Sequence, residues 1–489
     1  MKRLLIPLIF VSTLTACGVT ACGGGGSSTP TPHPVSYEPP VISGTNLNHV
    51  QPETMAIINL NTASLYSGND ILFYNLIGKG DINGDGYDDL VIGLFRHTTS
   101  PSYSGREYDP SGEIKPVVLF YDPVNDTYIV NAQLQSVIHK NQHPRQVAIA
   151  DFDGDGRNDI FIADHGYDDG PYGNQNTLLL NKSTGFVDGT DTLPQVTDFS
   201  HGLVIADFDN NGKPDLLLLN NRVDIRTKCS LYLGFTDCPY NPPKDSESYV
   251  LFNNGLAGLS RGTLNIPNKV INFTSTTSDF NLRLYVGHSA DFNRDGWPDL
   301  VISNHRDIFI IESTGAKGQF SSAQVFGPPP ALQSCEYTPV SAITSIDIDS
   351  DGENEIVASF TCNLNTAYFR AFKRNKSGTW EDKSDILIGD QTANASIIND
   401  GWCYKFEIAD VNADGKPDII CQSVRGQGSG NNNVFWTIAN GKLQSMNITL
   451  QNGAWAGFGT MVKNKTGNAI LGFNSPKGQP NLVIKRWKN

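Results

Sequence analysis

A nine-residue acidic phrase constrains this chain more than any other feature, because it recurs six times. In Asp151–Asp159 the sequence DFDGDGRND places carboxylates at positions 1, 3, 5 and 9 and a glycine, Gly156, at position 6. Carboxylates held this close repel one another unless a cation lies among them. Oxygens at these positions, together with a backbone carbonyl at position 7, form a cage typical of a hard ion such as Ca2+. The glycine permits the positive φ that turns the loop around the ion.

The other five copies keep this spacing, with Asp, Asn or Glu at the same four positions. Oxygen-only ligation favours Ca2+ over Zn2+ or Cu2+. We predict about six Ca2+ sites with a structural role, because protein ligands saturate the loops. In chain order, the predicted side-chain ligands of acidic loops 1 to 6 are Asp81, Asn83, Asp85 and Asp89; Asp151, Asp153, Asp155 and Asp159; Asp207, Asp209, Asn211 and Asp215; Asp291, Asn293, Asp295 and Asp299; Asp347, Asp349, Asp351 and Glu355; and Asp410, Asn412, Asp414 and Asp418. The predicted carbonyl ligands at position 7 belong to Tyr87, Arg157, Lys213, Trp297, Glu353 and Lys416.

The loops also explain most of the formal net charge of −14. They contain 20 acidic ligand side chains, and six calcium ions would supply +12 against the charge of −14. The calcium-loaded chain would therefore be close to neutral, at −2, and the chain has no run dense in Lys and Arg. Both observations argue against a nucleic-acid partner.

The first residues indicate export and a lipid anchor. Met1–Arg3 is basic, and Leu4–Ala16 is an apolar run too short to cross a bilayer. Cys17 and Cys22 each follow small residues in a pattern that resembles the lipobox of bacterial lipoproteins. We favour lipidation at Cys22, because it leaves six further cysteines, an even number suited to an oxidising compartment; Cys17 is the alternative. Cleavage by ordinary signal peptidase, with release of a soluble protein, also stays open.

The chain then divides into three parts. Residues 1–21 are the predicted lipoprotein signal peptide, and residues 22–48 form a flexible tether rich in Gly, Ser and Pro. Residues 49–489 form one folded domain. We expect the protein in the cell envelope of a bacterium, anchored by lipid to a membrane that is most simply the outer one.

Short apolar runs flank the acidic loops. Gln146–Ala150 precedes loop 2 and Ile160–Ala163 follows it, and such near-continuous runs predict strands buried on both faces. A third candidate, such as Thr177–Leu180, comes next, and a weaker fourth completes each unit. Loop-to-loop spacings of 70, 56, 84, 56 and 63 residues fit four strands plus insertions. The pattern predicts an all-β fold built from four-stranded antiparallel blades.

These loops in their strand contexts resemble FG-GAP/VCBS repeats, the calcium-binding blades of integrin-α-type β-propellers, over roughly residues 50 to 489. The resemblance implies that each calcium loop joins the innermost strand of a blade to the second strand. The Phe-Gly and Gly-Ala-Pro signatures of the family are mostly missing, so the likeness is to its bacterial branch and implies no integrin ligand specificity. An EF-hand is excluded, because position 12 holds no Glu; it is Ile92, Ile162, Leu218, Ile302, Ala358 or Cys421.

A seventh blade can be assembled without an acidic loop. Phe458–Val462, Ala469–Phe473 and Leu482–Lys485 supply three strands, with Lys463–Gly467 where the loop would be. Met55–Asn59, far away in sequence, can supply the outer strand and close the ring without a free sheet edge. We predict a seven-bladed β-propeller, with six or eight blades as the alternatives.

The cysteines give a disulfide hypothesis that rests on spacing, since six cysteines allow 15 pairings. Cys403 and Cys421 flank loop 6 and would bridge the first two strands of blade 6. The other predicted pairs are Cys229 with Cys238, in an insertion of blade 3, and Cys335 with Cys362, between two loops on one face.

A ligand is expected on the face opposite the acidic loops, where the innermost strands begin and the second strands end. Aromatic and polar side chains around such a mouth suit a sugar or a peptide. The candidate ligand-binding residues are His143, His165, Arg283, His305, Trp402 and Trp455. The alternative is that they are exposed loop residues and packing aromatics.

The sequence shows no nucleophile elbow, His-Glu-x-x-His motif or phosphate-binding glycine loop, and no catalytic residue is predicted. The leading hypothesis is a monomeric, calcium-stabilised, non-catalytic module that binds a glycan or protein partner and touches membrane only through its lipid. The first alternative is a polysaccharide-active lyase or hydrolase using the non-calcium face. A scaffold subunit for outer-membrane assembly is a third possibility.

Overall fold

The computed structural model describes residues 53–59, 71–97, 113–166, 173–196, 199–220, 248–266, 284, 286–304, 306–332, 335, 339–362, 366–389, 398–399, 403–412, 414–423, 435–446, 459–474 and 481–487. The predicted boundaries at residues 21 and 48 lie outside them. No helix in these ranges is long and apolar enough to span a membrane.

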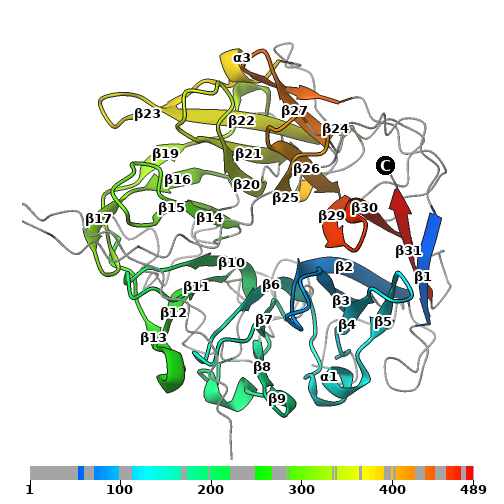
Figure 1. The fold of residues 1–489 in the computed structure, drawn as a ribbon. Coiled ribbons are helices and arrows are strands. Elements are labelled where there is room, and N and C mark those ends of the chain that lie inside the picture. The colour runs from blue at the N-terminus through cyan, green and yellow to red at the C-terminus, as the bar shows by residue number, and fades with distance from the viewer. Residues whose placement is uncertain are drawn as a thin grey trace, which may run out of the picture. The chain divides into compact units, whose positions relative to one another are not determined.

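In the described residues the fold consists of seven antiparallel blades, each with a path of four strands, as the sequence predicts (Figure 1). The strands are given from the innermost outward. Blade 1 contains β2 (Ile71–Gly80), β3 (Asp89–His97), β4 (Val117–Asp122) and β5 (Thr127–Val130). Blade 2 contains β6 (Pro144–Ala150), β7 (Asp159–Asp164), β8 (Thr177–Lys182) and β9 (Gly185–Asp188). Blade 3 contains β10 (Ser200–Ala206), β11 (Asp215–Asn220), β12 (Tyr249–Asn253) and β13 (Leu259–Gly262).

The remaining blades repeat this order. Blade 4 contains β14 (Gly287–Ala290), β15 (Asp299–Ser303), β16 (Ile308–Ile311) and β19 (Gln324–Phe326). Blade 5 contains β20 (Val340–Ile346), β21 (Glu355–Cys362), β22 (Thr366–Arg374) and β23 (Trp380–Asp382), with the short β24 (Ile398–Asn399) also paired to β22. Blade 6 contains β25 (Cys403–Ala409), β26 (Asp418–Ser423), β27 (Phe435–Ala439) and β28 (Lys442–Ser445). Blade 7 contains β29 (Gly459–Asn464), β30 (Gly467–Asn474), β31 (Asn481–Trp487) and β1 (Glu53–Asn59).

The second strands of the blades are deeply buried. All residues of β7, β11 and β15 are buried, because a neighbouring blade covers each face of the sheet. This explains the continuous Val/Ile/Leu runs that follow the acidic loops. The apolar cores lie between blades: Val91 and Val118 of blade 1 pack with Ile160 of blade 2 in one cluster. Equivalent clusters join blades 2 and 3, 3 and 4, 4 and 5, 5 and 6, and 7 and 1.

A polar contact links blades 6, 7 and 1. Glu407 of β25 accepts hydrogen bonds from Thr460 Oγ1 at 2.7 Å and Met461 N at 3.1 Å, both on β29. The same carboxylate forms an ion pair with Lys79 of β2. One side chain of blade 6 therefore ties together the innermost strands of the next two blades.

The ring closes through the two ends of the folded domain, as predicted. β1 pairs antiparallel with β31, and Ile58 lies opposite Leu482. The end of β29 meets acidic loop 1 of blade 1, where Asp88 N donates to Lys463 O at 3.0 Å. Blade 7 therefore contains strands from both ends and leaves no open edge between them.

Two predicted disulfides are confirmed. Cys403–Cys421 bridges β25 and β26 in blade 6, and Cys335–Cys362 links the segment before β20 to the end of β21. The predicted pair Cys229–Cys238 lies outside the described residues.

Some local elements were not predicted from the sequence pattern. Two short helices, α1 (Ala132–Val137) and α3 (Ser384–Leu387), and a hairpin, β17 (Ser313–Ala316) with β18 (Gln319–Phe320), lie outside the four-strand pattern. The innermost strand of blade 4 begins at Gly287, although the apolar run Leu284–Gly287, which precedes loop 4 as Gln146–Ala150 precedes loop 2, predicts a strand that begins at Leu284. Leu284 and Val286 are buried in the inter-blade clusters without belonging to a strand, so apolar character alone misplaced that boundary.

Ring closure predicts that substitutions at two adjacent positions of β1 differ strongly in their effect on the free energy of unfolding. Ile58 is 8% exposed in the cluster of blades 7 and 1, whereas Ile57 is 63% exposed. Ile58→Asp buries an unpaired charge and should lower the free energy of unfolding by roughly 3 kcal/mol. The matched control Ile57→Asp should change it by less than about 0.5 kcal/mol. Chemical denaturation measures both; equal effects would contradict the pairing of β1 with blade 7.

Candidate metal centre

The six acidic loops occupy the same place in six blades. Each one joins the innermost strand to the second strand: loop 1 joins β2 to β3, and the others join β6 to β7, β10 to β11, β14 to β15, β20 to β21 and β25 to β26. The strand order read from the sequence is therefore confirmed.

The position 1 carboxylate organises each loop from within. Its Oδ2 accepts a hydrogen bond from the backbone N–H of the position 6 glycine, at 2.8 Å in loop 1, 2.9 Å in loop 2 and 2.7 Å in loop 3. Loops 4, 5 and 6 repeat this bond at 2.9 Å. The position 5 side chain in turn accepts from the backbone N–H of position 7 in every loop. These bonds curl the backbone so that the acidic side chains stay together.

The glycine at position 6 adopts the predicted left-handed conformation in all six loops. The φ values are 88° at Gly86, 85° at Gly156, 84° at Gly212, 86° at Gly296, 89° at Gly352 and 81° at Gly415. A side chain is strained at such φ values, which explains why the repeat keeps glycine there.

The position 9 carboxylate fastens each loop to its blade. It is fully buried in all six loops, as Asp89, Asp159, Asp215, Asp299, Glu355 and Asp418. One of its oxygens accepts from the backbone N–H of position 2, at 2.7 to 3.0 Å. In blades 1 to 4 the other oxygen accepts a hydrogen bond from a backbone N–H in the third strand or just after it. The donors are the N–H groups of Tyr121, Asn181, Asn253 and Ser313.

The apolar residue at position 2 was not used in the sequence analysis, yet it anchors the loop to the core. Ile82, Phe152, Phe208, Phe292, Ile348 and Val411 are all buried. The first five belong to the cluster between their own blade and the next. Loop geometry and packing between blades are therefore coupled through adjacent residues.

The donor set fits a hard divalent cation. In loops 2 and 3, an oxygen of each carboxylate at positions 1, 3 and 9 lies within 4.8 Å of an oxygen of the other two; in loop 5 the same holds for Asp347, Asp349 and Asp351. In loop 3, Asp209 Oδ1 is buried and accepts no hydrogen bond, so it has a coordination position to offer. The side chains that would hold Ca2+ are those predicted above, all oxygen donors.

Burial raises the pKa of the position 9 carboxylates. The pKa rises from 3.8 to about 7 at Asp89, Asp215 and Asp299 and to about 6 at Asp159 and Asp418, because desolvation outweighs the backbone hydrogen bonds. The pKa of Glu355 is raised for the same reason. Without a cation, each of these groups disfavours its charged form.

The contacts of three lysines with the acidic loops were also not predicted from the sequence. Lys182, Lys317 and Lys373 form ion pairs with position 3 carboxylates, of Asp153, Asp209 and Asp349 respectively. The available sequence signal was the choice of Asp rather than Asn at position 3, which holds in loops 2, 3 and 5 alone.

On the opposite face, the structure brings two of the six candidate ligand-binding residues together. His143 precedes β6 and His165 follows β7, and their ring centroids lie 6.0 Å apart. His165 also packs on His201, at 5.2 Å, and on Phe199, at 6.0 Å. All four side chains are buried. Arg283, His305, Trp402 and Trp455 lie outside the described residues.

The buried carboxylate of Asp164 holds this part of the rim in place. It accepts backbone N–H bonds from Gln142 and His143, both at 2.8 Å, and from Gly166 at 2.9 Å. Its remaining donors are the side-chain amides of Asn141 and Asn174. Because β6 and β7 pair from Pro144–Asp164 to Ala150–Asp159, this hub lies at the end opposite loop 2.

Comparison with known proteins supports the repeat. The family described as FG-GAP-like repeat matches residues 135–218, 291–358 and 347–421, which include acidic loops 2 to 6. The chain therefore contains FG-GAP-like repeats. No curated protein sequence matches it.

Several solved structures are similar. An Agrocybe aegerita lectin, described by its specific recognition of non-reducing terminal N-acetylglucosamine, matches with 14% identity and a TM-score of 0.39, over 88% of this chain and 93% of the lectin. AofleA from Arthrobotrys oligospora matches with 12% identity and a TM-score of 0.35, over 85% and 99%. A Bacillus licheniformis rhamnogalacturonan lyase matches with 12% identity and a TM-score of 0.28, over 89% of this chain and 61% of the lyase, less than two thirds of its length. All three TM-scores are below 0.5, so these similarities carry no argument about function.

The raised pKa values predict how the calcium-free protein responds to pH. Between pH 3.8 and about 7 the folded state holds protons on Asp89, Asp215 and Asp299 that the unfolded state has released. The folded state then binds more protons, so the stability contribution of these groups falls as pH rises through this window. Calcium should reverse the trend, because it binds the deprotonated oxygens.

Thermal melts in chelator at several pH values between 4.5 and 7.5, with and without excess calcium, measure this. Asp215→Asn should flatten the chelated profile, since the amide does not titrate. A calcium-free melting temperature that rises steadily across the window would contradict the assignment.

Proposed function

We propose that this chain is a calcium-stabilised β-propeller of the bacterial cell envelope that serves as a non-catalytic binding module for a glycan or protein. The observation that carries the calcium assignment is the sixfold repetition of one loop geometry. Six loops share their internal hydrogen bonds, their buried position 9 carboxylate and their oxygen-only donor sets. A bound cation would neutralise groups whose charged forms burial disfavours.

The rigid rim of blade 2 supports a binding role. Five donors converge on Asp164 and fix the backbone of residues 141–143 and 164–166. A rim held by a buried hydrogen-bond network loses little conformational entropy when a ligand binds. His143 and His165 lie in this rim, and we propose that it forms part of the ligand surface.

The remaining assignments extend the same proposal. Residues 1–21 direct export, Cys22 (or Cys17) carries the lipid, and residues 22–48 tether the propeller 49–489 to the membrane, most simply the outer one. The propeller acts as a monomer that contacts the membrane only through its anchor. The basic and apolar leader, the lipobox-like cysteines and the Gly/Ser/Pro-rich segment support these steps.

Chelation tests the calcium assignment. Extracellular calcium modules bind with Kd of about 10⁻⁴ to 10⁻³ M, so six sites in 10 mM calcium should together raise the melting temperature by roughly 10 °C or more over excess EGTA. Restoring calcium beyond the chelator is the control and should restore the melt. An identical melt in EGTA and in calcium would refute the assignment.

A glycan array probed with the calcium-loaded propeller tests the binding role. We expect retention of a defined glycan class and no new reducing ends or unsaturated products on prolonged incubation. Asp164→Asn replaces an acceptor at a hub of five donors and should weaken binding at least tenfold while the chelation effect persists. The exposed Asp191→Asn in the same blade is the control. Release of cleaved products would instead favour the polysaccharide-active enzyme.

A further inference from the structure

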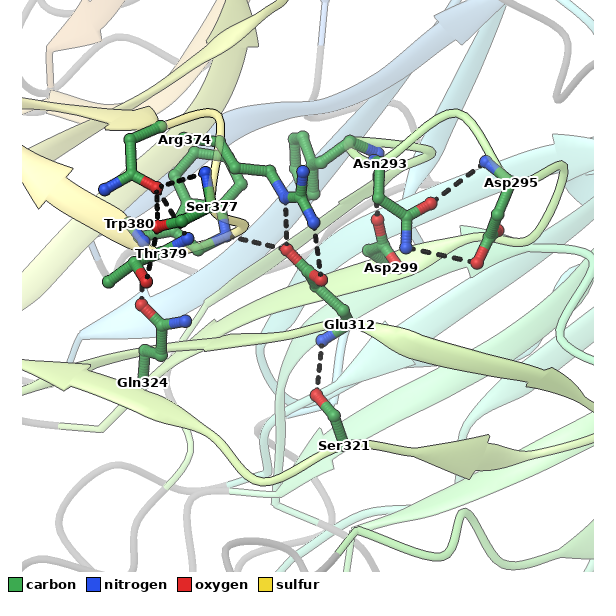
Figure 2. A network of polar contacts seen from close by, with 12 residues as sticks. Asn293, Asp295, Asp299, Glu312, Ser321, Gln324, Arg374, Ser377, Thr379 and Trp380 are labelled. Atoms are coloured by element: carbon green, nitrogen blue, oxygen red, sulfur yellow. Dashed lines mark hydrogen bonds and ion pairs between the residues drawn. The ribbon is translucent and has the colours of Figure 1, made fainter.

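Position 3 divides the acidic loops into two classes. In loops 1, 4 and 6 it is Asn, and the Asn side-chain amide donates to the position 5 Asp: Asn83 to Asp85 at 3.1 Å, Asn293 to Asp295 at 3.1 Å (Figure 2), and Asn412 to Asp414 at 3.2 Å. In loops 2, 3 and 5 it is Asp, which cannot donate. Each of these three carboxylates receives a lysine ammonium instead.

Loop 5 shows the second class most clearly. Lys373 Nζ lies 2.7 Å from Asp349 Oδ2, 2.7 Å from Asp351 Oδ2 and 2.7 Å from Glu355 Oε1. These are the position 3, 5 and 9 ligands of one predicted calcium site. A single ammonium thus contacts three of the four carboxylates that would surround the metal.

The strand geometry directs Lys373 at its own loop. Ile356, the residue after the position 9 ligand, pairs with Phe372, so Lys373 is one step further along β22. In blade 6, Ile419 pairs with Trp436, and the residue one step further is Thr437. Thr437 Oγ1 accepts from Asn412 Nδ2 at 2.9 Å, the position 3 residue of loop 6. The same register position therefore contacts position 3 in both blades, as Lys with Asp or as Thr with Asn.

The neighbouring arginine shows that this direction is specific. Arg374 follows Lys373 but turns to blade 4, where Nε lies 2.7 Å from Glu312 Oε1 (Figure 2). Trp380 Nε1 donates to the same oxygen at 3.1 Å. Successive side chains of a strand point to opposite faces, so of these two neighbours it is Lys373 that reaches loop 5.

Loops 2 and 3 obtain an ammonium from other places in the fold. Lys182, the last residue of β8, pairs with Asp153 and lies 3.8 Å from Asp155 Oδ2. Lys317, in the hairpin turn between β17 and β18 of blade 4, reaches Asp209 of blade 3 at 2.6 Å and lies over the Phe252 ring. Three lysines from unrelated positions thus meet the three position 3 aspartates, which points to a shared electrostatic requirement.

We propose that Lys373 is a tethered cation that occupies loop 5 when calcium is absent and competes with calcium for the same carboxylates. Lys182 and Lys317 do the same, with fewer contacts, in loops 2 and 3. This inference rests on the calcium assignment proposed above and divides its sites into two kinds. Loops 1, 4 and 6 bind calcium without a competing ammonium, whereas loops 2, 3 and 5 exchange an internal ammonium for it.

The charge balance gives the physical reason. Among the side chains at positions 1, 3, 5 and 9, loops 2 and 5 have four carboxylates each, and loops 1, 3, 4 and 6 have three. One ammonium brings loops 2 and 5 to the net charge of the three-carboxylate loops, and in loop 3 it offsets the position 3 carboxylate that loops 1, 4 and 6 lack. The lysine thereby lowers repulsion in the empty loop, and calcium must displace it or share its ligands.

Calorimetric titration of calcium into the calcium-free full-length chain, as wild type and as Lys373→Met, tests the inference. Wild type should show a tighter and a weaker class of sites, and the variant should move one site to the tighter class, with roughly tenfold higher affinity. In EGTA the variant should melt below wild type, because loop 5 has lost its internal cation. Lys383→Met is the matched control: it removes the same charge from the same blade, where Lys383 pairs with Glu381 away from the loops.

Two further variants guard against a folding defect. Lys373→Arg keeps the charge and should keep the weaker class close to wild type. Asp349→Asn with Lys373→Thr reproduces the Asn412–Thr437 pair of loop 6 and should bind calcium in the tighter class. Suppose that the wild type takes up calcium, but that Lys373→Met changes neither the calcium affinities nor the melting temperature in EGTA. That result would overturn the inference and leave the calcium assignment standing. A wild type that takes up no calcium would instead refute the assignment and, with it, the exchange.

Discussion

Repulsion between carboxylates is the constraint on which the rest of this structure depends. Each acidic loop brings three or four of them into one turn, and backbone N–H groups satisfy only part of their charge. The position 9 carboxylate is buried against its blade, where its charged form is disfavoured. The adjacent position 2 side chain is packed between two blades. Any cation that relieves the repulsion therefore also fixes the strand pair that begins each blade and the surface on which the next blade packs.

Ring closure depends on a different set of contacts. Blade 7 has the turn Asn464–Gly467, which contains Lys465 and no carboxylate, in place of an acidic loop, and it is assembled from both ends of the folded domain. Arg486 of β31 pairs with Glu53 of β1 and with Asp126 of blade 1. Glu407 and Lys79 join the inner strands across the same region. Fixed protein charges thus hold the junction of the ring, whereas exchangeable cations are proposed to hold the six repeated blades.

Much of this architecture could be predicted from the sequence, because its strongest signals are local. The nonapeptide spacing determines the turn, the glycine at position 6 determines its φ, and the apolar runs on either side determine the strands. The outer strand of blade 7 could also be predicted, since an open sheet edge has an evident energetic cost. The lysine contacts could not, because Lys182, Lys317 and Lys373 lie at different distances from their loops in sequence and meet them only in the folded chain. The burial of His143 and His165 was missed for a related reason: the Asp164 hub that encloses them draws on five separate residues.

Apolar packing thus forms the blades of this propeller, and we propose that cations, some of them internal, complete its turns. Anomalous diffraction from crystals grown in calcium tests that claim most directly, because it locates each ion independently of any stability effect. We expect calcium peaks inside all six acidic loops, bounded by the side chains at positions 1, 3, 5 and 9, with the ammonium of Lys373 moved away from loop 5. Loops without calcium peaks at saturating concentration would contradict that claim.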